Sequence, residues 1–165
     1  MERLTTRQPP TGPWKLFFRA PIWLYRLHLG WLLGGRFLLM EHVGRRSGLV
    51  RRVVVEVVHH DRDADTYTVA SGFGPRSDWY LNLKEHPDIA IRVGRRYLAV
   101  RAHFLSADEG ADVMERYARE HTKAAPELAK FMGFQVDGSA EDYRAVGREV
   151  PFVRFTRRSR PRATA

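Results

Sequence analysis

The 165-residue chain is 44% hydrophobic and carries a formal net charge of +9, with 28 Lys and Arg against 19 Asp and Glu. It contains no cysteine, which excludes a disulfide framework, a catalytic thiolate, an iron–sulfur cluster and cysteine-ligated zinc. The length fits one domain with its own hydrophobic core. The positive charge predicts an anionic partner such as a phosphate, a nucleic acid, an anionic lipid or an acidic cofactor.

The most apolar part of the chain follows a polar, flexible tail at residues 1–12 and extends over residues 13–35. Arginines and Pro21 interrupt it, whereas a membrane-spanning helix needs about 20 nearly uncharged residues. A signal peptide also fits poorly, because the apolar run starts late and carries arginines through its middle. We therefore expect neither a transmembrane segment nor a secretion signal, and place the protein in the cytoplasm.

The same segment predicts an amphipathic helix over about residues 21–33. Its apolar stripe comprises Trp23, Leu24, Leu27 and Trp31. Lys15 and Arg26 would then meet lipid headgroups, which favours a peripheral protein at the inner face of the membrane. The alternatives are that the helix covers the domain's own core or contacts a dimer partner.

A first hairpin is predicted next, from Phe37–Val43 through the turn Gly44–Gly48 into Val50–His60. The strand Val50–His60 is the clearest in the chain. Its near-continuous valines predict burial on both faces, as in a barrel or a dimer interface. A polar turn at Asp61–Asp65 leads into the returning strand Thr66–Gly72, so these strands are expected to pair antiparallel.

Helices and hairpins are predicted over the rest of the chain. Ser77 begins a short helix that ends near His86, and a capping box at Ser106–Glu109 opens another that runs to about Glu120. The remaining expected elements are the hairpin strands Asp88–Val93 and Tyr97–Leu105, helices at Pro126–Met132 and Ser139–Gly147, a last strand at Val150–Phe155, and a basic disordered tail over residues 157–165. Hairpin-linked strands predict an α+β domain over residues 36–156, a small antiparallel β-barrel with flanking helices.

The turn Gly44–Gly48 is the first candidate site. Its two glycines free the backbone for a tight turn whose N–H groups converge on an anion. Arg45, Arg46 and Arg51 add forked guanidinium donors, and Ser47 adds a hydroxyl. Together these groups suit a phosphate. A solvated surface turn is the alternative.

Two further segments have the composition of a ligand site. Small residues in Val69–Gly74 would let a flat ring lie against the backbone, although an ordinary strand end is the simpler explanation. In Asp78–Leu83, Trp79 is expected in the core. Tyr80 and Asn82 serve either a ligand or the hydrogen bonding that buried polar side chains need.

None of the seven histidines shows a metal-binding spacing, and no serine lies in a Gly-x-Ser-x-Gly elbow. The sequence therefore offers no obvious protein nucleophile, base or metal site. An enzyme of this sequence would rely on a bound organic cofactor for its chemistry.

Taken together, these segments resemble the deazaflavin-dependent nitroreductase family of the flavin-binding split β-barrel superfamily. The resemblance is carried, in order, by Gly44–Gly48 with Arg51, by Val69–Gly72 and by Trp79–Leu83. It implies a split β-barrel, commonly a homodimer, that binds reduced coenzyme F420 and passes a hydride to an electron-poor acceptor. We expect a quinone as that acceptor, with FMN as the alternative cofactor.

The resemblance also implies roles for individual residues. The phosphate would be held by Arg45, Arg46, Ser47, Gly48 and Arg51, and the deazaflavin ring would lie beside Ala70, Ser71, Trp79, Tyr80 and Asn82. Tyr143 is the nearest match to the tyrosine that donates a proton in family members. Arg46 stands where relatives often have Lys, so the charge is kept while the donor geometry differs.

Two other function classes fit the same sequence. A non-catalytic module that binds a cofactor, a lipid or an anion would use the apolar N-terminal segment and the basic end of the chain. Nucleic-acid binding is suggested by charge alone, and no feature indicates a specific nucleic-acid partner.

Overall fold

The computed structural model describes residues 1–3 and 35–158 of the chain. The amphipathic helix expected over residues 21–33, and most of the basic tail expected over residues 157–165, lie outside the described residues. Within the described part, no helix is both long enough and apolar enough to cross a membrane.

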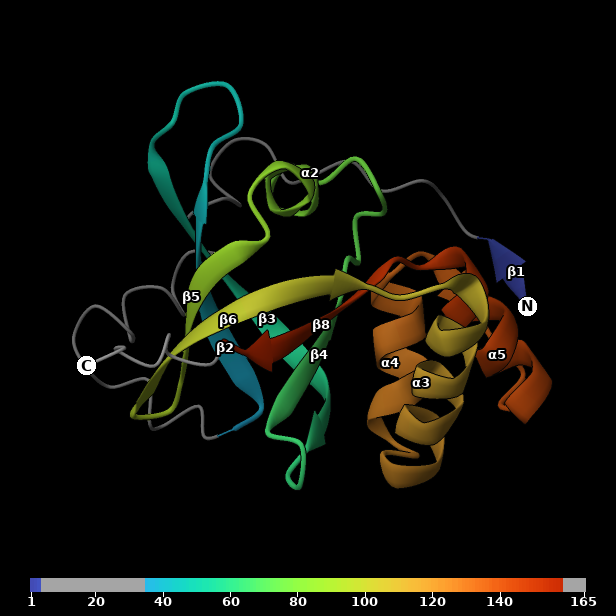
Figure 1. Cartoon of the computed structure of the whole chain (residues 1–165). Helices are drawn as coiled ribbons and strands as arrows, with labels where there is room; N and C mark the ends of the chain where they lie inside the picture. The colour runs from blue at the N-terminus through green and yellow to red at the C-terminus, as the bar shows by residue number, and fades with distance from the viewer. Residues whose placement is uncertain (4–34, 159–165) are drawn as a thin grey trace.

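Six antiparallel strands close into a barrel, which confirms the predicted architecture. The strands are β2 (Phe37–Val43), β3 (Val50–Asp61), β4 (Thr66–Ala70), β5 (Asp88–Val93), β6 (Arg96–Phe104) and β8 (Phe152–Arg157). Around the barrel the order is β2, β3, β4, β8, β6 and β5 (Figure 1). Each of these strands pairs on both sides, so none of the six presents a free sheet edge.

In the described part, four helices flank the barrel: α2 (Asp78–Glu85), α3 (Ala107–Glu120), α4 (Ala124–Phe131) and α5 (Ala140–Glu149). Figure 1 shows α2 over the end of the barrel to which the β2–β3 hairpin extends, whereas α3, α4 and α5 stand together beside the strands. The capping box predicted at the start of α3 is present. The Ser106 hydroxyl accepts the backbone N–H of Glu109 at 3.3 Å, and the Glu109 carboxylate accepts the Ser106 N–H at 2.9 Å.

Helices α3 and α5 cross at two glycines, Gly110 and Gly147. A Cβ atom added to Gly147 would lie 2.4 Å from the carbonyl oxygen of Gly110, and one added to Gly110 would lie 2.5 Å from that of Gly147. Both contacts are with backbone, which cannot move aside without separating the helices. The two glycines therefore allow α3 and α5 to pack closely; we call α3, α4 and α5 together the helical cluster.

The described ends of the chain differ from the expectation of loose tails. Strand β1 (Glu2–Arg3) pairs antiparallel with β7 (Phe134–Gln135), although residues 1–12 are expected to form a flexible tail. Strand β8 continues to Arg157, so the basic tail starts later than predicted. A two-residue strand has no readable periodicity, which is why the sequence predicts neither β1 nor β7.

The valines of β3 are mostly half-buried, so the predicted burial of both faces holds only in part: Val57 packs against the barrel core, and its neighbour Val58 is buried among residues of the helical cluster. Val53, Val55 and Val57 pack against the barrel core, whereas Val50 is 64% exposed. The reason is the length of the strand. Its first residues pair with the end of β2 in a hairpin that projects from the barrel on the side of α2 (Figure 1).

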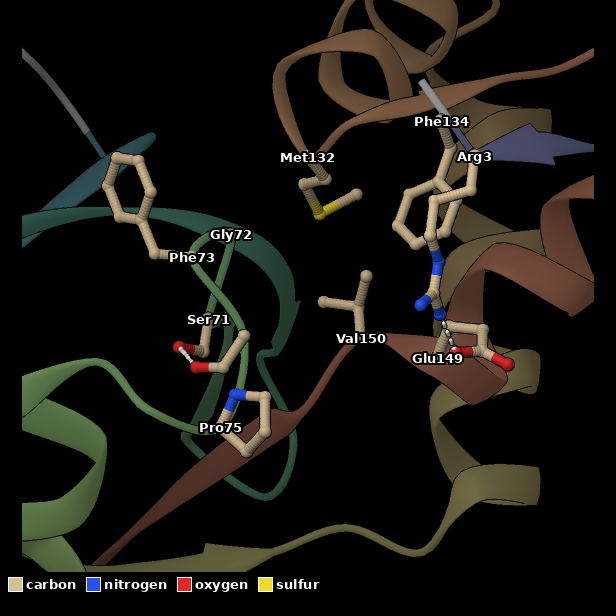
Figure 2. A pocket seen from close by; sticks show the side chains of 10 residues that line it. Arg3, Ser71, Gly72, Phe73, Pro75, Met132, Phe134, Glu149 and Val150 are labelled. Atoms are coloured by element: carbon tan, nitrogen blue, oxygen red, sulfur yellow. Dashed lines mark hydrogen bonds and ion pairs between the residues drawn. The ribbon is translucent and has the colours of Figure 1, made fainter. Parts of the chain in front are cut away.

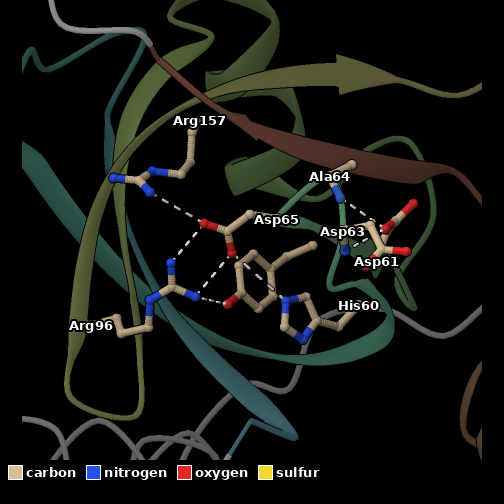
Figure 3. Close-up of polar contacts among 8 residues, drawn as sticks. His60, Asp61, Asp63, Ala64, Asp65, Arg96 and Arg157 are labelled. Atoms are coloured by element: carbon tan, nitrogen blue, oxygen red, sulfur yellow. Dashed lines mark hydrogen bonds and ion pairs between the residues drawn. The ribbon is translucent and has the colours of Figure 1, made fainter.

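Charged side chains tie several strand ends together near the β3–β4 turn (Figure 3). Asp65, with a φ of 49°, accepts two hydrogen bonds from the Arg96 guanidinium, at 2.6 and 2.9 Å, and lies 3.5 Å from that of Arg157. The hydrogen bonds from Arg96 lower the pKa of Asp65. Arg96 also donates to the Tyr67 hydroxyl at 2.9 Å. We call Asp65, Arg96 and Arg157 the Asp65 clasp, because they fasten this turn to β6 and β8.

Candidate functional site

The turn Gly44–Gly48, which joins β2 to β3, is tight, as predicted. The Gly48 N–H donates to the Gly44 carbonyl at 2.8 Å, and the Gly44 N–H donates to the Leu49 carbonyl at 2.9 Å. Gly48 has a φ of 66°, a conformation that favours glycine, and a Cβ on Gly44 would displace the Ser47 hydroxyl. The tip of the turn is exposed.

The three arginines at this turn differ in their partners. The Arg45 guanidinium donates to the carboxylate of Asp78 at 3.1 Å and to the side-chain carbonyl of Asn82 at 3.0 Å. Arg46 and Arg51 are exposed, and neither forms an ion pair within residues 1–3 and 35–158. These two guanidiniums therefore remain available to an anion, whereas Arg45 is already paired.

Below the turn, Asn82 of α2 also accepts the backbone N–H of Arg45 at 3.0 Å. The Asn82 amide nitrogen lies 3.0 Å from Nδ1 of His42, and burial lowers the pKa of His42 to about 4. The imidazole is therefore neutral at neutral pH. Sequence reasoning missed His42, although its signal is readable: Leu38, Met40 and His42 alternate along β2 and share one buried face.

The loop between β4 and α2 is shaped by Ser71, which is 1% exposed. Its hydroxyl lies 2.7 Å from the carbonyl oxygen of Gly74 and 2.6 Å from the hydroxyl of Ser77. Ser77 precedes α2 as predicted, but its hydroxyl bonds within this loop and does not cap the helix. Ser71 therefore fixes the loop, with its hydroxyl facing the loop interior.

A cavity of about 120 Å³ lies between this loop and the helical cluster (Figure 2). An ion pair between Arg3 and Glu149 borders it, and Gly72 lies so close to the helices that a Cβ there would be 3.1 Å from the Phe131 ring. Ligand pockets usually exceed ~300 Å³, so this cavity admits part of a ring system. Its apolar walls are Phe73, Pro75, Met132, Phe134 and Val150.

The side chains predicted beside a ring lie mainly in the core. Trp79 and Tyr80 belong to the barrel core, and the Tyr80 ring packs edge-on against Phe104 with centroids 5.2 Å apart. Burial raises the pKa of the Tyr80 hydroxyl. Ala70 is half-buried against the helical cluster. None of Ala70, Trp79 and Tyr80 lines the cavity, and their contact with a cofactor ring stays a prediction.

Tyr143, the predicted proton donor, lies on α5 and is 5% exposed. It belongs to the same core cluster as Met132 and Val150, two residues of the cavity wall, but does not line the cavity itself. Burial raises the pKa of its hydroxyl, which keeps its proton at neutral pH. Its catalytic role stays a prediction.

Comparison with known sequences identifies a family. A sequence profile described as F420H(2)-dependent quinone reductase matches residues 19–138, which include every segment on which the predicted resemblance depends. Rv3178 of Mycobacterium tuberculosis strain H37Rv, named as an F420H(2)-dependent quinone reductase, is 35% identical over 81 residues. That match covers 48% of this chain and 66% of Rv3178, just under two thirds of its length.

Solved structures share the fold at low sequence identity. An F420-H2-dependent reductase, FDR-A, has a TM-score of 0.50 at 20% identity, over 73% of this chain and 93% of its own. A pyridoxamine 5′-phosphate oxidase-related, FMN-binding protein of Nostoc punctiforme PCC 73102 has a TM-score of 0.53 at 15% identity, over 89% and 81%. A structure described as a domain-swapped dimer has a TM-score of 0.50 at 18% identity, over 82% and 99%. These likenesses confirm the predicted split β-barrel.

Proposed function

The chain belongs to the F420H(2)-dependent quinone reductase family, and from this premise we propose that it transfers a hydride from reduced coenzyme F420 to a quinone. The observation that carries the proposal is the Gly44–Gly48 turn, where the guanidiniums of Arg46 and Arg51 are exposed and unpaired within the described residues. The family name also specifies a quinone as acceptor, in place of the nitro compound in the name of the predicted family.

The residues at the turn suit the acidic arm of coenzyme F420, which carries a phosphate and a glutamate tail. Arg46 and Arg51 supply planar donors that form paired hydrogen bonds to phosphate and carboxylate oxygens. Arg45 is already neutralised by Asp78, so its contribution is to hold the turn. Of the three arginines predicted to bind the acidic arm, the proposal therefore keeps Arg46 and Arg51.

The Ser71–Gly74 loop and the neighbouring cavity suit the edge of a flat ring. Gly72 and Gly74 have no side chains to obstruct a ring, while Phe73 and Met132 make the adjoining cavity apolar. The ring of the reduced cofactor supplies the hydride when bound. Apolar walls exclude water and help hold a conjugated acceptor in contact with the ring, which favours transfer through orientation.

A quinone that accepts a hydride also needs a proton. Tyr143 holds a proton at neutral pH and is the candidate donor, with water as the alternative. The Tyr143→Phe variant separates the two. A fall in kcat of about tenfold with unchanged affinity for F420 would identify Tyr143, and an unchanged kcat would identify water.

Two further partners belong to the proposal. A homodimer is suggested by the structural relative described as a domain-swapped dimer. A membrane surface is suggested by the apolar segment at residues 13–35, most of which lies outside the described residues. Light scattering of the purified protein tests the first, and flotation with anionic vesicles tests the second.

Titration of the purified protein with F420, followed by cofactor fluorescence, tests the proposed cofactor. We expect saturable quenching at micromolar concentrations, and weaker binding of FMN, which has no glutamate tail for the second free arginine. Protein-dependent oxidation of reduced F420 by a soluble quinone then tests the activity. Absence of F420 binding at these concentrations would refute the proposal.

A further inference from the structure

A buried polar group joins the β2–β3 hairpin to α2. His42 and Asn82 are 5% and 4% exposed, and Arg45 reaches Asn82 from the turn above. Polar side chains buried to this extent destabilise a protein unless they are hydrogen-bonded. We call these three residues the His42 clamp.

Asn82 has little hydrogen-bonding capacity left for a ligand. Its Oδ1 accepts both the backbone N–H and the guanidinium of Arg45, each at 3.0 Å, and its Nδ2 lies 3.0 Å from Nδ1 of His42. An amide oxygen has two lone pairs, and both are in use. Asn82 therefore holds the turn through its hydrogen bonds with Arg45, although the resemblance implies a place for it beside the cofactor ring.

Arg45 and His42 together fix which way the Asn82 amide faces. The amide nitrogen only donates, so Nδ1 of His42 must accept, and the single ring proton is on Nε2. If the amide were turned over, its oxygen would face the lone pair of Nδ1, and its NH2 group would face two donors of Arg45. Burial keeps the ring neutral at neutral pH, which preserves the acceptor.

The turn has few attachments other than this clamp. Its backbone hydrogen bonds, from Gly48 to Gly44 and from Gly44 to Leu49, stay within the hairpin. In the described ranges, every hydrogen bond that joins residues 45–48 to another element comes from Arg45 and ends on α2. One of its two partners, the Asp78 side chain, is 86% exposed, so the buried Asn82 is the more firmly placed anchor.

We propose that His42 and Asn82 are positioning residues: through Arg45 they fix the turn so that its exposed arginines face a bound anion. This inference rests on the proposed function, because it describes how the same turn is prepared for the acidic arm of coenzyme F420. A turn that is already ordered loses less conformational entropy on binding, and its affinity is correspondingly higher.

Two substitutions at one position separate the hydrogen bond from simple packing. His42→Asn keeps an acceptor close to the position of Nδ1, whereas His42→Leu fills the space without one. We expect His42→Leu to weaken F420 binding about tenfold, and His42→Asn to stay within about twofold of the wild type. Thr68→Val is the matched control, because the buried Thr68 hydroxyl has no hydrogen-bond partner among the described residues.

Nitrogen-15 NMR of the ligand-free protein gives a readout that does not depend on the cofactor. We expect an unprotonated Nδ1 and a protonated Nε2 at His42. The Arg45 amide should exchange slowly in the wild type and rapidly in His42→Leu. A proton on Nδ1, or an Arg45 amide that exchanges freely in the wild type, would overturn the inference even if His42→Leu fails to fold.

The outcomes distinguish this inference from the proposed function. If the wild type does not bind F420, the proposed function fails, and the positioning role fails with it. If the wild type binds F420 and a folded His42→Leu variant binds with the same affinity, positioning is overturned while the proposed function stands.

Discussion

The β2–β3 and β3–β4 turns lie at opposite ends of β3, and arginines surround both, but these arginines have different partners. At the β3–β4 turn, the guanidiniums of Arg96 and Arg157 both pair with the carboxylate of Asp65, and this Asp65 clasp fastens the turn to β6 and β8 (Figure 3). At the β2–β3 turn, Arg45 has an acidic partner, whereas Arg46 and Arg51 have none within the described residues. The same side chain therefore stabilises the fold at one turn and is available for binding at the other.

Removing the unpaired cations should give the largest effect on binding. For Arg46→Ala/Arg51→Ala we expect the Kd for F420 to rise about 100-fold, because each charge-assisted hydrogen bond contributes about 1.5 kcal/mol or more. Fluorescence titration measures the affinity, and thermal unfolding should show a Tm within about 2 °C of the wild type. Arg62→Ala removes one positive charge at the β3–β4 turn and is the control for the single variants Arg46→Ala and Arg51→Ala, which each remove one. An equal loss of affinity there would mean that net charge, and not the β2–β3 turn, attracts the cofactor.

The His42 clamp should make the protein less stable in mild acid. The folded-state pKa of His42 is about 4, below its ordinary value of 6.5, so the unfolded chain binds more protons between these values. The resulting loss in the free energy of unfolding is absent well above pH 6.5, grows as the pH falls, and reaches its full size below pH 4. It amounts to about 2 kcal/mol between pH 7 and pH 5.

Urea unfolding of the wild type and His42→Asn at both pH values measures this contribution. The asparagine variant does not titrate at this position and should lose about 2 kcal/mol less between pH 7 and pH 5. Burial also lowers the pKa of His59, but that contribution is common to both proteins and cancels. An identical loss in the two proteins would show that His42 titrates normally in the fold.

Removing the charge from the Asp65 clasp should affect stability and leave binding unchanged. Asp65→Asn tolerates the positive φ but leaves Arg96 and Arg157 without their carboxylate. We expect a loss of about 1–2 kcal/mol, since the pairs are charge-assisted but partly exposed. Denaturant unfolding measures it. A changed Kd for F420 would show that the two turns are coupled.

Ionic strength should give the smallest difference between the turns. Raising NaCl from about 0.05 M to about 0.5 M should weaken F420 binding several-fold, because Arg46 and Arg51 are exposed to screening ions. The Tm should change little, because the Asp65 clasp contributes only part of the stability. Salt-independent F420 binding would argue against an electrostatic role of the β2–β3 turn.

The sequence predicts the barrel well because its signals are local. Phe37–Val43 and Asp88–Val93 begin and end where predicted, and the capping box at Ser106 forms as expected. Contacts between distant residues were not predictable. Three arginines are visible at the β2–β3 turn, yet only the docking of α2 determines that Asp78 pairs with Arg45.

The valines of β3 show the same limit of prediction from local sequence. Their composition indicates a strand correctly, but composition does not reveal how far the hairpin projects beyond the barrel. Local pattern thus predicts which residues form a strand, while burial depends on what the rest of the chain places against it.

Hydrogen bonds from Arg45 to α2 maintain the shape of the β2–β3 turn, so the exposed residues that take no part in these bonds are free to vary. Substitutions at Arg46, Ser47 or Arg51 remove none of the hydrogen bonds that join Arg45 to α2. Directed evolution of cofactor preference should therefore begin at these three positions, where libraries would yield mostly folded proteins and altered selectivity for longer, shorter or less acidic cofactors.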